Sequence, residues 1–364
     1  MFDPKIWAAV PFHFWSLVFF TFGCMVGSFL NVCIHRMPRG ESIVSPPSHC
    51  PHCGYAIPWY LNIPLATWLY LRGRCANCRA PISARYFLVE LLTGIAFLSC
   101  WLAFGHKSAW LVFIYCLFVD GLIAATFIDF EHFIIPDEIT LGGIGAGFLC
   151  SFALPLLHER KDAVGSLFAS FLGIVVGGGV ILAILQIGKL VFGRQKIPLP
   201  PGTRIIFTEG SLILPDSEIP YEEVFFRDSD TIRVEARTVE LVDRGYWNVP
   251  VRLSPERLRV GPDELKPEEM PHMEVTADCI ILPREAMGMG DVKFMAAIGA
   301  FLGWQATLFA LMLSSVLGAT VGVVLIALKR HEWSSRLPYG PYIAVAAVVW
   351  VFAGKRVLAA LLGQ

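Results

Sequence analysis

Two short acidic stretches hold the residues best suited to chemistry. The stretch 127–137 reads FIDFEHFIIPD and ends an apolar run with Asp129, Glu131 and Asp137. In the second stretch, MGMGDVKFM, Asp291 stands between a polar approach and an apolar segment. Two carboxylates held close together cannot both ionise cheaply, so such a pair shares one proton. One member then acts as general base on a water while its protonated partner polarises a peptide carbonyl, which is the chemistry of an aspartic protease.

Asp129 and Asp291 also have a plainer explanation, that of helix-end charges held by a neighbouring arginine or lysine. Two features favour a catalytic role. Ionisable side chains at membrane depth are costly, and those present there are functional candidates. Gly288 and Gly290 precede Asp291, and glycine lets the backbone approach closely or adopt a positive φ. The sequence therefore predicts that Asp129 and Asp291 form the catalytic pair.

Neighbouring polar residues have structural explanations. Asp137 follows Pro136 and opens an apolar segment, so we expect it to cap the N-terminus of a helix. Glu131 is typical of a loop acid, and Asp120, inside an apolar segment, of a buried polar contact. Lys293 has two explanations: it neutralises the site or contacts substrate, or its side chain reaches toward the membrane interface.

Four clustered cysteines predict a metal site. They form two CxxC pairs separated by residues 54–74: Cys50 and Cys53 in CPHCG, and Cys75 and Cys78 in CANCR. Two such knuckles supply the thiolates of a tetrahedral structural zinc site. A thioredoxin-like redox role would need one CxxC at a helix start in a βαβ unit, and disulfides are disfavoured on the cytoplasmic side. His49 and His52 are alternative ligands, although ordinary loop histidines explain them more simply.

The composition is that of a polytopic membrane protein. Of the 364 residues, 55% are hydrophobic and 16% are charged, and the mean hydropathy is +0.60. A membrane-spanning helix takes about 20 apolar residues. The apolar segments, of which 292–302 is short for a span, are 14–34, 87–104, 109–128, 139–157, 163–192, 292–302, 306–328 and 342–362. We therefore expect an all-α polytopic membrane protein with about eight transmembrane helices, the first retained rather than cleaved as a signal peptide.

Charge distribution sets the expected topology. The loop 35–86 carries many arginines and a single acid, Glu41, so the positive-inside rule places it in the cytoplasm. Counting spans from that loop puts Asp129 and Asp291 at cytoplasmic helix ends. The expected order is a first transmembrane helix (1–34), the cytoplasmic cysteine-rich loop (35–86), four further helices (87–193), a cytoplasmic insertion (194–284), and the GxGD motif with the last helices (285–364).

Residues 194–284 differ from the rest of the chain. They are polar and acidic with prolines at the entry and exit, and the runs TRIIF, SLIL, TIRVEA, TVELV and HMEVTADCIIL predict short strands. We expect a small β-rich cytoplasmic insertion. That it acts as a substrate guide, a lid or a partner-binding module is a hypothesis, and a deletion that leaves substrate processing intact would instead make it a passive appendage.

A series of motifs, in the same order along the chain, resembles those of type IV prepilin peptidases, the bacterial GxGD-type membrane aspartic proteases. The motifs are GSFLNVCIHRMPRGES (27–42), the paired CxxC knuckles, RYFLVELLTG (85–94), IDFEHFIIPDEIT (128–140), GMGDVKFMAAIGAFLGW (288–304) and PYGPYIA (338–344). The resemblance covers nearly the whole chain apart from the insertion, where most members have a short loop.

This resemblance implies that Asp129 and Asp291 cleave the leader from type IV prepilins or type II secretion pseudopilins at the cytoplasmic face of the bacterial inner membrane. Many members also N-methylate the new N-terminus with S-adenosylmethionine, and Gly73 aligns with a glycine tied to methyl transfer. The implied partners are these substrates, membrane lipid and the pilus or secretion machinery, with no nucleic acid.

A non-catalytic membrane protein is the main alternative, either a transporter with acids along an ion path or a scaffold with a zinc-binding regulatory loop. The position of the acids separates these classes. A transport acid should lie near the bilayer midplane, whereas Asp129 and Asp291 are expected at cytoplasmic helix ends.

Overall fold

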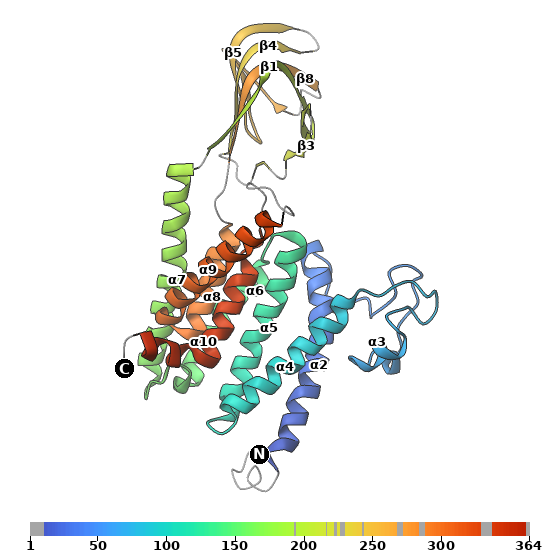
Figure 1. The fold of residues 1–364 in the computed structure, drawn as a ribbon, viewed down its shortest axis with the longest axis vertical. Helices are drawn as coiled ribbons and strands as arrows, with labels where there is room; N and C mark the ends of the chain where they lie inside the picture. The colour runs from blue at the N-terminus through green and yellow to red at the C-terminus, as the bar shows by residue number, and fades with distance from the viewer. Residues whose placement is uncertain are drawn as a thin grey trace. The chain divides into compact units, whose positions relative to one another are not determined.

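The computed structural model describes residues 11–192, 194–215, 217–221, 224–225, 230–241, 244–267, 272–283, 288–328 and 337–361. The chain forms two compact units. One comprises Met1–Ile181 with Met289–Gln364, and the other comprises Leu182–Gly288. Figure 1 shows a bundle of helices in the first unit and a β-sheet in the second.

The first unit is helical. Its elements are α2 (Phe12–Arg36), η1 (Met37–Arg39), η2 (Trp59–Leu61), α3 (Ala66–Tyr70), α4 (Ala84–Phe104), α5 (Ala109–His132), α6 (Asp137–Ala153), η3 (Pro155–His158), the first part of α7 (Ala163–Phe192), α8 (Met289–Leu302), α9 (Trp304–Ala327) and α10 (Gly340–Leu361). The eight expected apolar segments all fall on helices. The segment expected at 139–157 ends as an α-helix at Ala153 and continues as η3.

Five of these helices are long and apolar enough to cross a membrane: Phe12–Arg39, Ala84–Phe104, Ala109–His132, Ala163–Gly188 and Trp304–Ala327. Helix α6 has 17 residues and α8 has 14, and the apolar part of α10 described as a span candidate is the shorter Gly340–Gly354. The expectation of eight spanning helices therefore stays a prediction. The sequence also contains a basic turn with Lys329, Arg330 and Arg336, which the positive-inside rule predicts to face the cytoplasm; these residues lie outside the described ones.

Small residues bring the helices of this unit close together. A Cβ on Gly173 of α7 would lie 2.0 Å from the carbonyl oxygen of Gly299 on α8, so the two backbones pack directly against each other. The hydroxyl of Ser170 donates to the Ala300 carbonyl at 2.9 Å, which adds a polar link between α7 and α8. These contacts hold α8, the helix that begins within the GxGD sequence, against α7.

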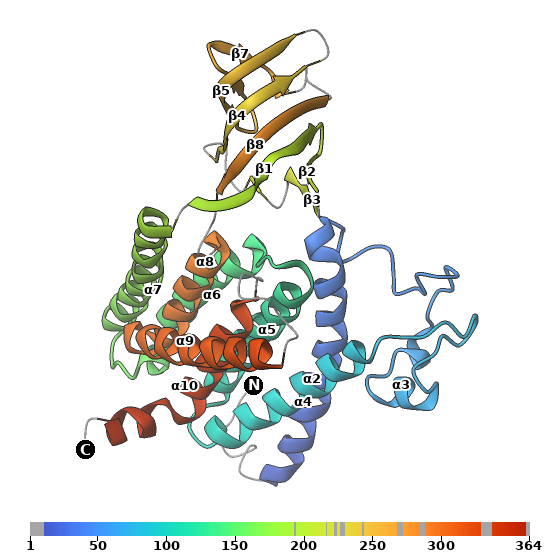
Figure 2. The same cartoon turned by 45° about the horizontal axis from the view of Figure 1, so that its top comes forward.

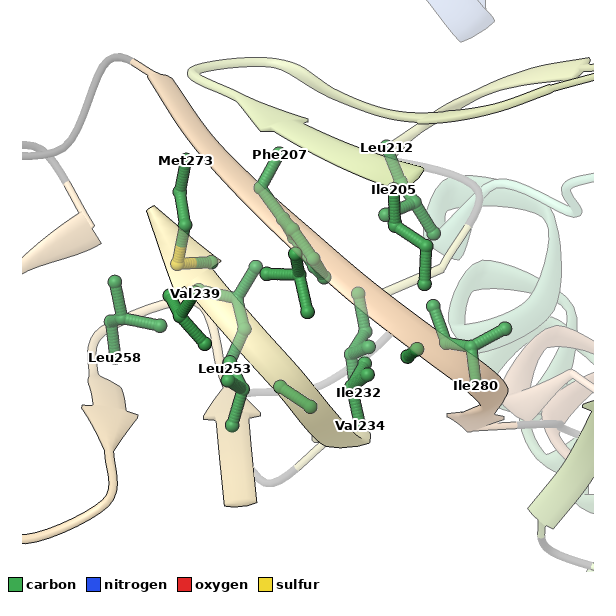
Figure 3. Packing of buried hydrophobic residues seen from close by; sticks show 14 of the residues in the cluster. Ile205, Phe207, Leu212, Ile232, Val234, Val239, Leu253, Leu258, Met273 and Ile280 are labelled. Carbon is green, nitrogen blue, oxygen red and sulfur yellow. The ribbon is translucent and has the colours of Figure 1, made fainter. Parts of the chain in front are cut away.

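The second unit is an antiparallel sheet. Its strands are β1 (Arg194–Thr208), β2 (Ser211–Leu214), β3 (Ser217–Pro220), β4 (Ile232–Glu240), β5 (Gly245–Leu253), β6 (Leu258–Val260), β7 (Asp263–Leu265) and β8 (His272–Pro283), in the order β3-β2-β1-β8-β4-β5-β6-β7. Alternate residues are buried along β4 and β8. Figure 3 shows Ile205, Phe207 and Met273 in the resulting apolar cluster, which gives the insertion its own core.

The structure confirms the β-rich insertion but corrects its details. The runs TIRVEA and TVELV belong to one strand, β4, rather than two. The sequence did not predict β5, because it contains Pro250, which lacks a backbone N–H. In the structure Asn248 of this strand adopts a positive φ of 50°. It also missed β6 and β7, which are three residues long. In the part of the insertion that the structure describes, the strands form one sheet of eight.

Candidate active site and metal centre

Asp129 lies in the last turn of α5 and is buried, with 6% of its surface exposed. Its Oδ2 accepts a hydrogen bond at 2.8 Å from the backbone N–H of Gly340, the first residue of α10. The start of a helix has backbone N–H groups without intrahelical partners, which makes it a natural place to bind a carboxylate. Helix α10 therefore fixes the orientation of the Asp129 carboxylate.

Gly340 is glycine because nothing larger fits. A Cβ at this position would lie 2.8 Å from Asp129 Oδ2 and 3.2 Å from Ile135 Cδ1. The sequence analysis quoted this glycine only within PYGPYIA and gave it no role. Its position at the start of an apolar helix, between two Pro-Tyr steps, was the feature that could have identified it.

Ile135 joins the two acidic stretches. It lies in the connection between α5 and α6, is 8% exposed, and is approached by both Gly340 and Gly290. A Cβ on Gly290 would lie 3.4 Å from Ile135 Cβ, so the GxGD backbone packs against the same side chain that packs beside Asp129. Asp291 follows Gly290 in the first turn of α8. The structure thus gathers the end of α5 and the starts of α8 and α10 around Ile135.

Asp137 and Lys293 form an ion pair. The Lys293 Nζ lies 2.6 Å from Asp137 Oδ1 and joins the first turn of α8 to the first turn of α6. The expectation that Asp137 caps α6 is wrong, because Pro136 occupies the N-cap position and no side-chain capping bond forms. As an acid in the first turn, Asp137 still suits the helix dipole. Lys293 therefore ties two helix starts together beside the GxGD sequence.

Two other acids of α5, Glu131 and Asp120, differ in their surroundings. Glu131, expected in a loop, lies in the last turn of the helix and forms an ion pair with Arg85 in the first turn of α4. Asp120 was expected to make a buried polar contact. Its Oδ1 is buried, and within the part of the chain that the structure describes this atom has no hydrogen-bond partner.

Cys50, Cys53, Cys75 and Cys78 come together in the loop between α2 and α4. Their sulfur atoms all lie within 4.8 Å of one another, and Cys50 Sγ is 3.8 Å from Cys78 Sγ. A tetrahedral zinc with Zn–S bonds of about 2.3 Å requires S···S separations of about 3.8 Å. The donor set and its spacing therefore fit a structural zinc ion.

The two knuckles have matching backbones. The Cys50 N–H donates to the Tyr55 carbonyl at 2.9 Å, and the Cys75 N–H donates to the Ala80 carbonyl at 2.8 Å. In the second knuckle the backbone N–H groups of Cys78 and Asn77 lower the pKa of Cys75 to about 6, which favours the thiolate that binds metal. His49 is not part of the four-cysteine group, and its Nδ1 lies 3.0 Å from the Pro47 carbonyl oxygen.

Gly73 lies just before the second knuckle and has a tightly defined conformation. Its φ is +66°, and a Cβ there would lie 2.9 Å from the Trp68 ring. Its N–H donates to the Trp68 carbonyl and its carbonyl accepts from Ile82. Gly73 therefore closes the turn after α3 and supports Trp68, whatever further role it has.

These features define a class of protein: a multi-pass membrane protein with a GxGD aspartate at one helix start and a four-cysteine loop. Residues 21–104 match the bacterial peptidase A24 N-terminal domain, and residues 274–323 match the type IV leader peptidase family. The cysteine loop and Gly73 fall in the first match and Asp291 in the second, while Asp129 lies outside both.

Full-length relatives agree with these matches. The chain is 32% identical over 368 residues to the prepilin leader peptidase/N-methyltransferase of Aeromonas hydrophila, covering 94% of this chain and 92% of that one. It is 26% identical over 358 residues to the protein of the same name from Pseudomonas aeruginosa, covering 92% and 89%. No solved structure matches. The chain belongs to the prepilin leader peptidase/N-methyltransferase family.

Proposed function

We propose that this protein is a membrane aspartic endopeptidase that removes the leader of type IV prepilins or type II secretion pseudopilins, with Asp129 and Asp291 as its catalytic pair. The observation that supports this most is the packing of the Asp129 carboxylate, Gly340 and the GxGD backbone around Ile135. The expected loss of cleavage when either aspartate is replaced, argued in the Discussion, tests the proposal.

In this mechanism the pair holds one proton between two carboxylates. The member that is ionised takes a proton from a water, which attacks the peptide carbonyl polarised by the protonated member. The Gly340 N–H holds Asp129 Oδ2 in place, which leaves Oδ1 for the shared proton or the water. The Lys293–Asp137 ion pair is an exposed link between α8 and the start of α6, beside Asp291 but outside the catalytic pair.

The proposed setting is the bacterial inner membrane, crossed by about eight helices, with both aspartates at the cytoplasmic face. The arginine-rich loop 35–86 supports this orientation through the positive-inside rule. Asp129 lies in the last turn of a helix rather than at its middle, which favours a peptidase site over an ion path through the bilayer. The proposed partners are prepilin or pseudopilin substrates, membrane lipid and the pilus or secretion assembly machinery.

The four cysteines are proposed to bind a structural zinc ion. We expect wild-type protein purified without chelator to contain about one zinc per chain, and Cys50→Ser or Cys75→Ser to lose most of it, since a structural site needs its four ligands. Metal analysis of purified protein measures this directly. Limited proteolysis should then cut the loop faster in both variants.

Cys279→Ser is the matched control for the zinc experiment, because Cys279 lies on β8 of the insertion and outside the four-cysteine group. It should keep its full zinc content. Wild-type protein without stoichiometric zinc would remove the metal assignment.

N-methylation of the new N-terminus, with S-adenosylmethionine as donor, is proposed for the cysteine loop. If Gly73 serves this step through the Trp68 packing, Gly73→Ala should lower methyl transfer by about tenfold or more while leaving cleavage nearly unchanged, because a Cβ would displace the Trp68 ring. The mass of the processed N-terminus reports both activities in one assay.

Gly54→Ala is the matched control for that variant. Gly54 has nearly the same φ, +69°, but nothing lies within 4 Å of a Cβ there. It should carry the same backbone strain without displacing a neighbour. Equal loss of methyl transfer in both variants would show that strain in the loop, and not the Trp68 contact, is responsible.

A further inference from the structure

Residues 58–74 of the cysteine loop, here called the aromatic segment, expose several large side chains. Trp59 is 83% exposed and Tyr70 is 82% exposed. The other large apolar side chains exposed in this segment are those of Tyr60, Ile63 and Leu69. Tryptophan and tyrosine with a free polar edge are typical of the interface between membrane and water.

Two contacts fix the aromatic segment against α4. The Leu65 N–H donates to Glu90 Oε2 at 2.7 Å, and the rings of Trp68 and Phe87 lie 5.2 Å apart. Figures 1 and 2 both show α3 near the end of α4 at which the cysteine loop joins it. Glu90 comes six residues after Ala84, where α4 begins, so this contact lies about 9 Å along the helix.

The length of α4 bears on the depth at which this contact lies. Helix α4 has 21 residues, so its length is about 31 Å, close to the ~30 Å hydrocarbon thickness of a bilayer. A span of this length needs nearly all of its residues inside the membrane. Leu88, Leu92 and Ile95 are exposed on α4 and form the surface that such a span presents to lipid.

The Glu90 contact also accompanies a strained backbone conformation at Leu65. Leu65 has φ 59° and ψ −51°, and the Ala66 N–H donates to the Pro64 carbonyl at 2.6 Å, which is the geometry of the rare, strained γ-turn. The Glu90 carboxylate satisfies the N–H of the central residue. A buried acid on a membrane helix therefore holds one turn of the loop at a fixed depth.

Arg72 and Arg74, at the C-terminal end of the aromatic segment, are both exposed. We propose that the aromatic segment is an interfacial anchor embedded in the phospholipid leaflet where α4 begins, with Trp59, Tyr60 and Tyr70 at headgroup level and the two arginines on lipid phosphates. The inference rests on α4 spanning the membrane and does not depend on which peptide the active site cleaves.

The full-length protein, reconstituted into vesicles of phosphatidylethanolamine and phosphatidylglycerol, tests this proposal by fluorescence. Subtracting the emission of Trp59→Phe from that of the wild type isolates the Trp59 contribution. We expect this contribution to be shifted to shorter wavelength, quenched by lipids brominated near the glycerol end of their chains, and poorly quenched by acrylamide.

Trp247→Phe gives the matched control, because Trp247 is 72% exposed on β5 of the insertion, a unit with its own core. If acrylamide quenches the Trp59 contribution as strongly as that of Trp247 and bromolipids leave it unchanged, the anchor does not exist. If Trp59 becomes protected only when a prepilin leader peptide is added, the surface binds substrate and the lipid proposal is also wrong.

The Glu90 contact is tested in the same vesicles. Glu90→Leu removes the acceptor of the Leu65 N–H and should largely abolish bromolipid quenching of Trp59, whereas Glu90→Gln keeps an acceptor oxygen and should restore it. Zinc content serves as the folding control for both variants. Unchanged Trp59 quenching in a zinc-replete Glu90→Leu protein would show that Glu90 does not set the depth of the segment.

Discussion

Asp129→Asn and Asp291→Asn are each expected to lower the rate of leader removal by about 10³-fold or more, since either change deprives the pair of the proton exchange on which general acid–base catalysis depends. Asparagine at position 129 keeps an oxygen that accepts the Gly340 N–H, so the packing at the start of α10 should survive. The measurement is the cleavage rate of a purified prepilin by protein in detergent or vesicles.

Asp137→Asn is the control for these two variants. Asp137 lies in the same region, but its carboxylate is engaged by Lys293 and is more than half exposed, at 57%. Its loss should weaken an exposed ion pair and change the cleavage rate only a few-fold. Normal processing by either Asp129→Asn or Asp291→Asn would show that the catalytic pair is misassigned.

Gly340→Ala is expected to lower cleavage by about 100-fold, although the position carries no functional group. The added Cβ would lie 2.8 Å from Asp129 Oδ2, so the carboxylate or the start of α10 must move. Displacements of about 1 Å in a catalytic group are enough to cost about 100-fold in rate. The backbone N–H at position 340 would still be present as a donor in this variant, which makes the effect steric rather than a lost hydrogen bond.

Gly318→Ala on α9 controls for the general effect of adding a methyl group in this bundle. A Cβ there would meet Tyr342 at 3.5 Å, an ordinary contact. The thermal stability of the two purified variants should be compared alongside their cleavage rates. Equal activity of Gly340→Ala and Gly318→Ala would mean that the Gly340 contact does not orient Asp129.

The parts of this protein that local patterns encode were predictable from its sequence. Long apolar runs gave the helices, and the CxxC spacing gave the four sulfur atoms within 4.8 Å of one another. The β-branched runs around Ile205 and Val275 indicated strands because alternate residues face one core. Each of these features shows as a residue pattern within short stretches of the chain.

Contacts between distant segments were not predictable in the same way. The Gly340 N–H reaches Asp129 across 211 residues, and Lys293 reaches Asp137 across 156. No periodicity links such residues, because tertiary packing alone decides which helix starts meet. Likewise, nothing local to Glu90 indicated that it holds the backbone at Leu65. The Asp137 prediction failed for a different, local reason: the helix begins at Asp137 itself, so that Pro136 occupies the N-cap position.

The most direct test of the central claim, that Asp129 and Asp291 act as one catalytic unit, is the residual cleavage rate of the double variant Asp129→Asn with Asp291→Asn. Protein in excess over substrate, with products followed by mass spectrometry, makes slow cleavage measurable. Residues that act as a unit are strongly non-additive, so the double variant should cleave about as slowly as either single variant. Rate losses that multiply in the double variant would contradict a shared catalytic pair.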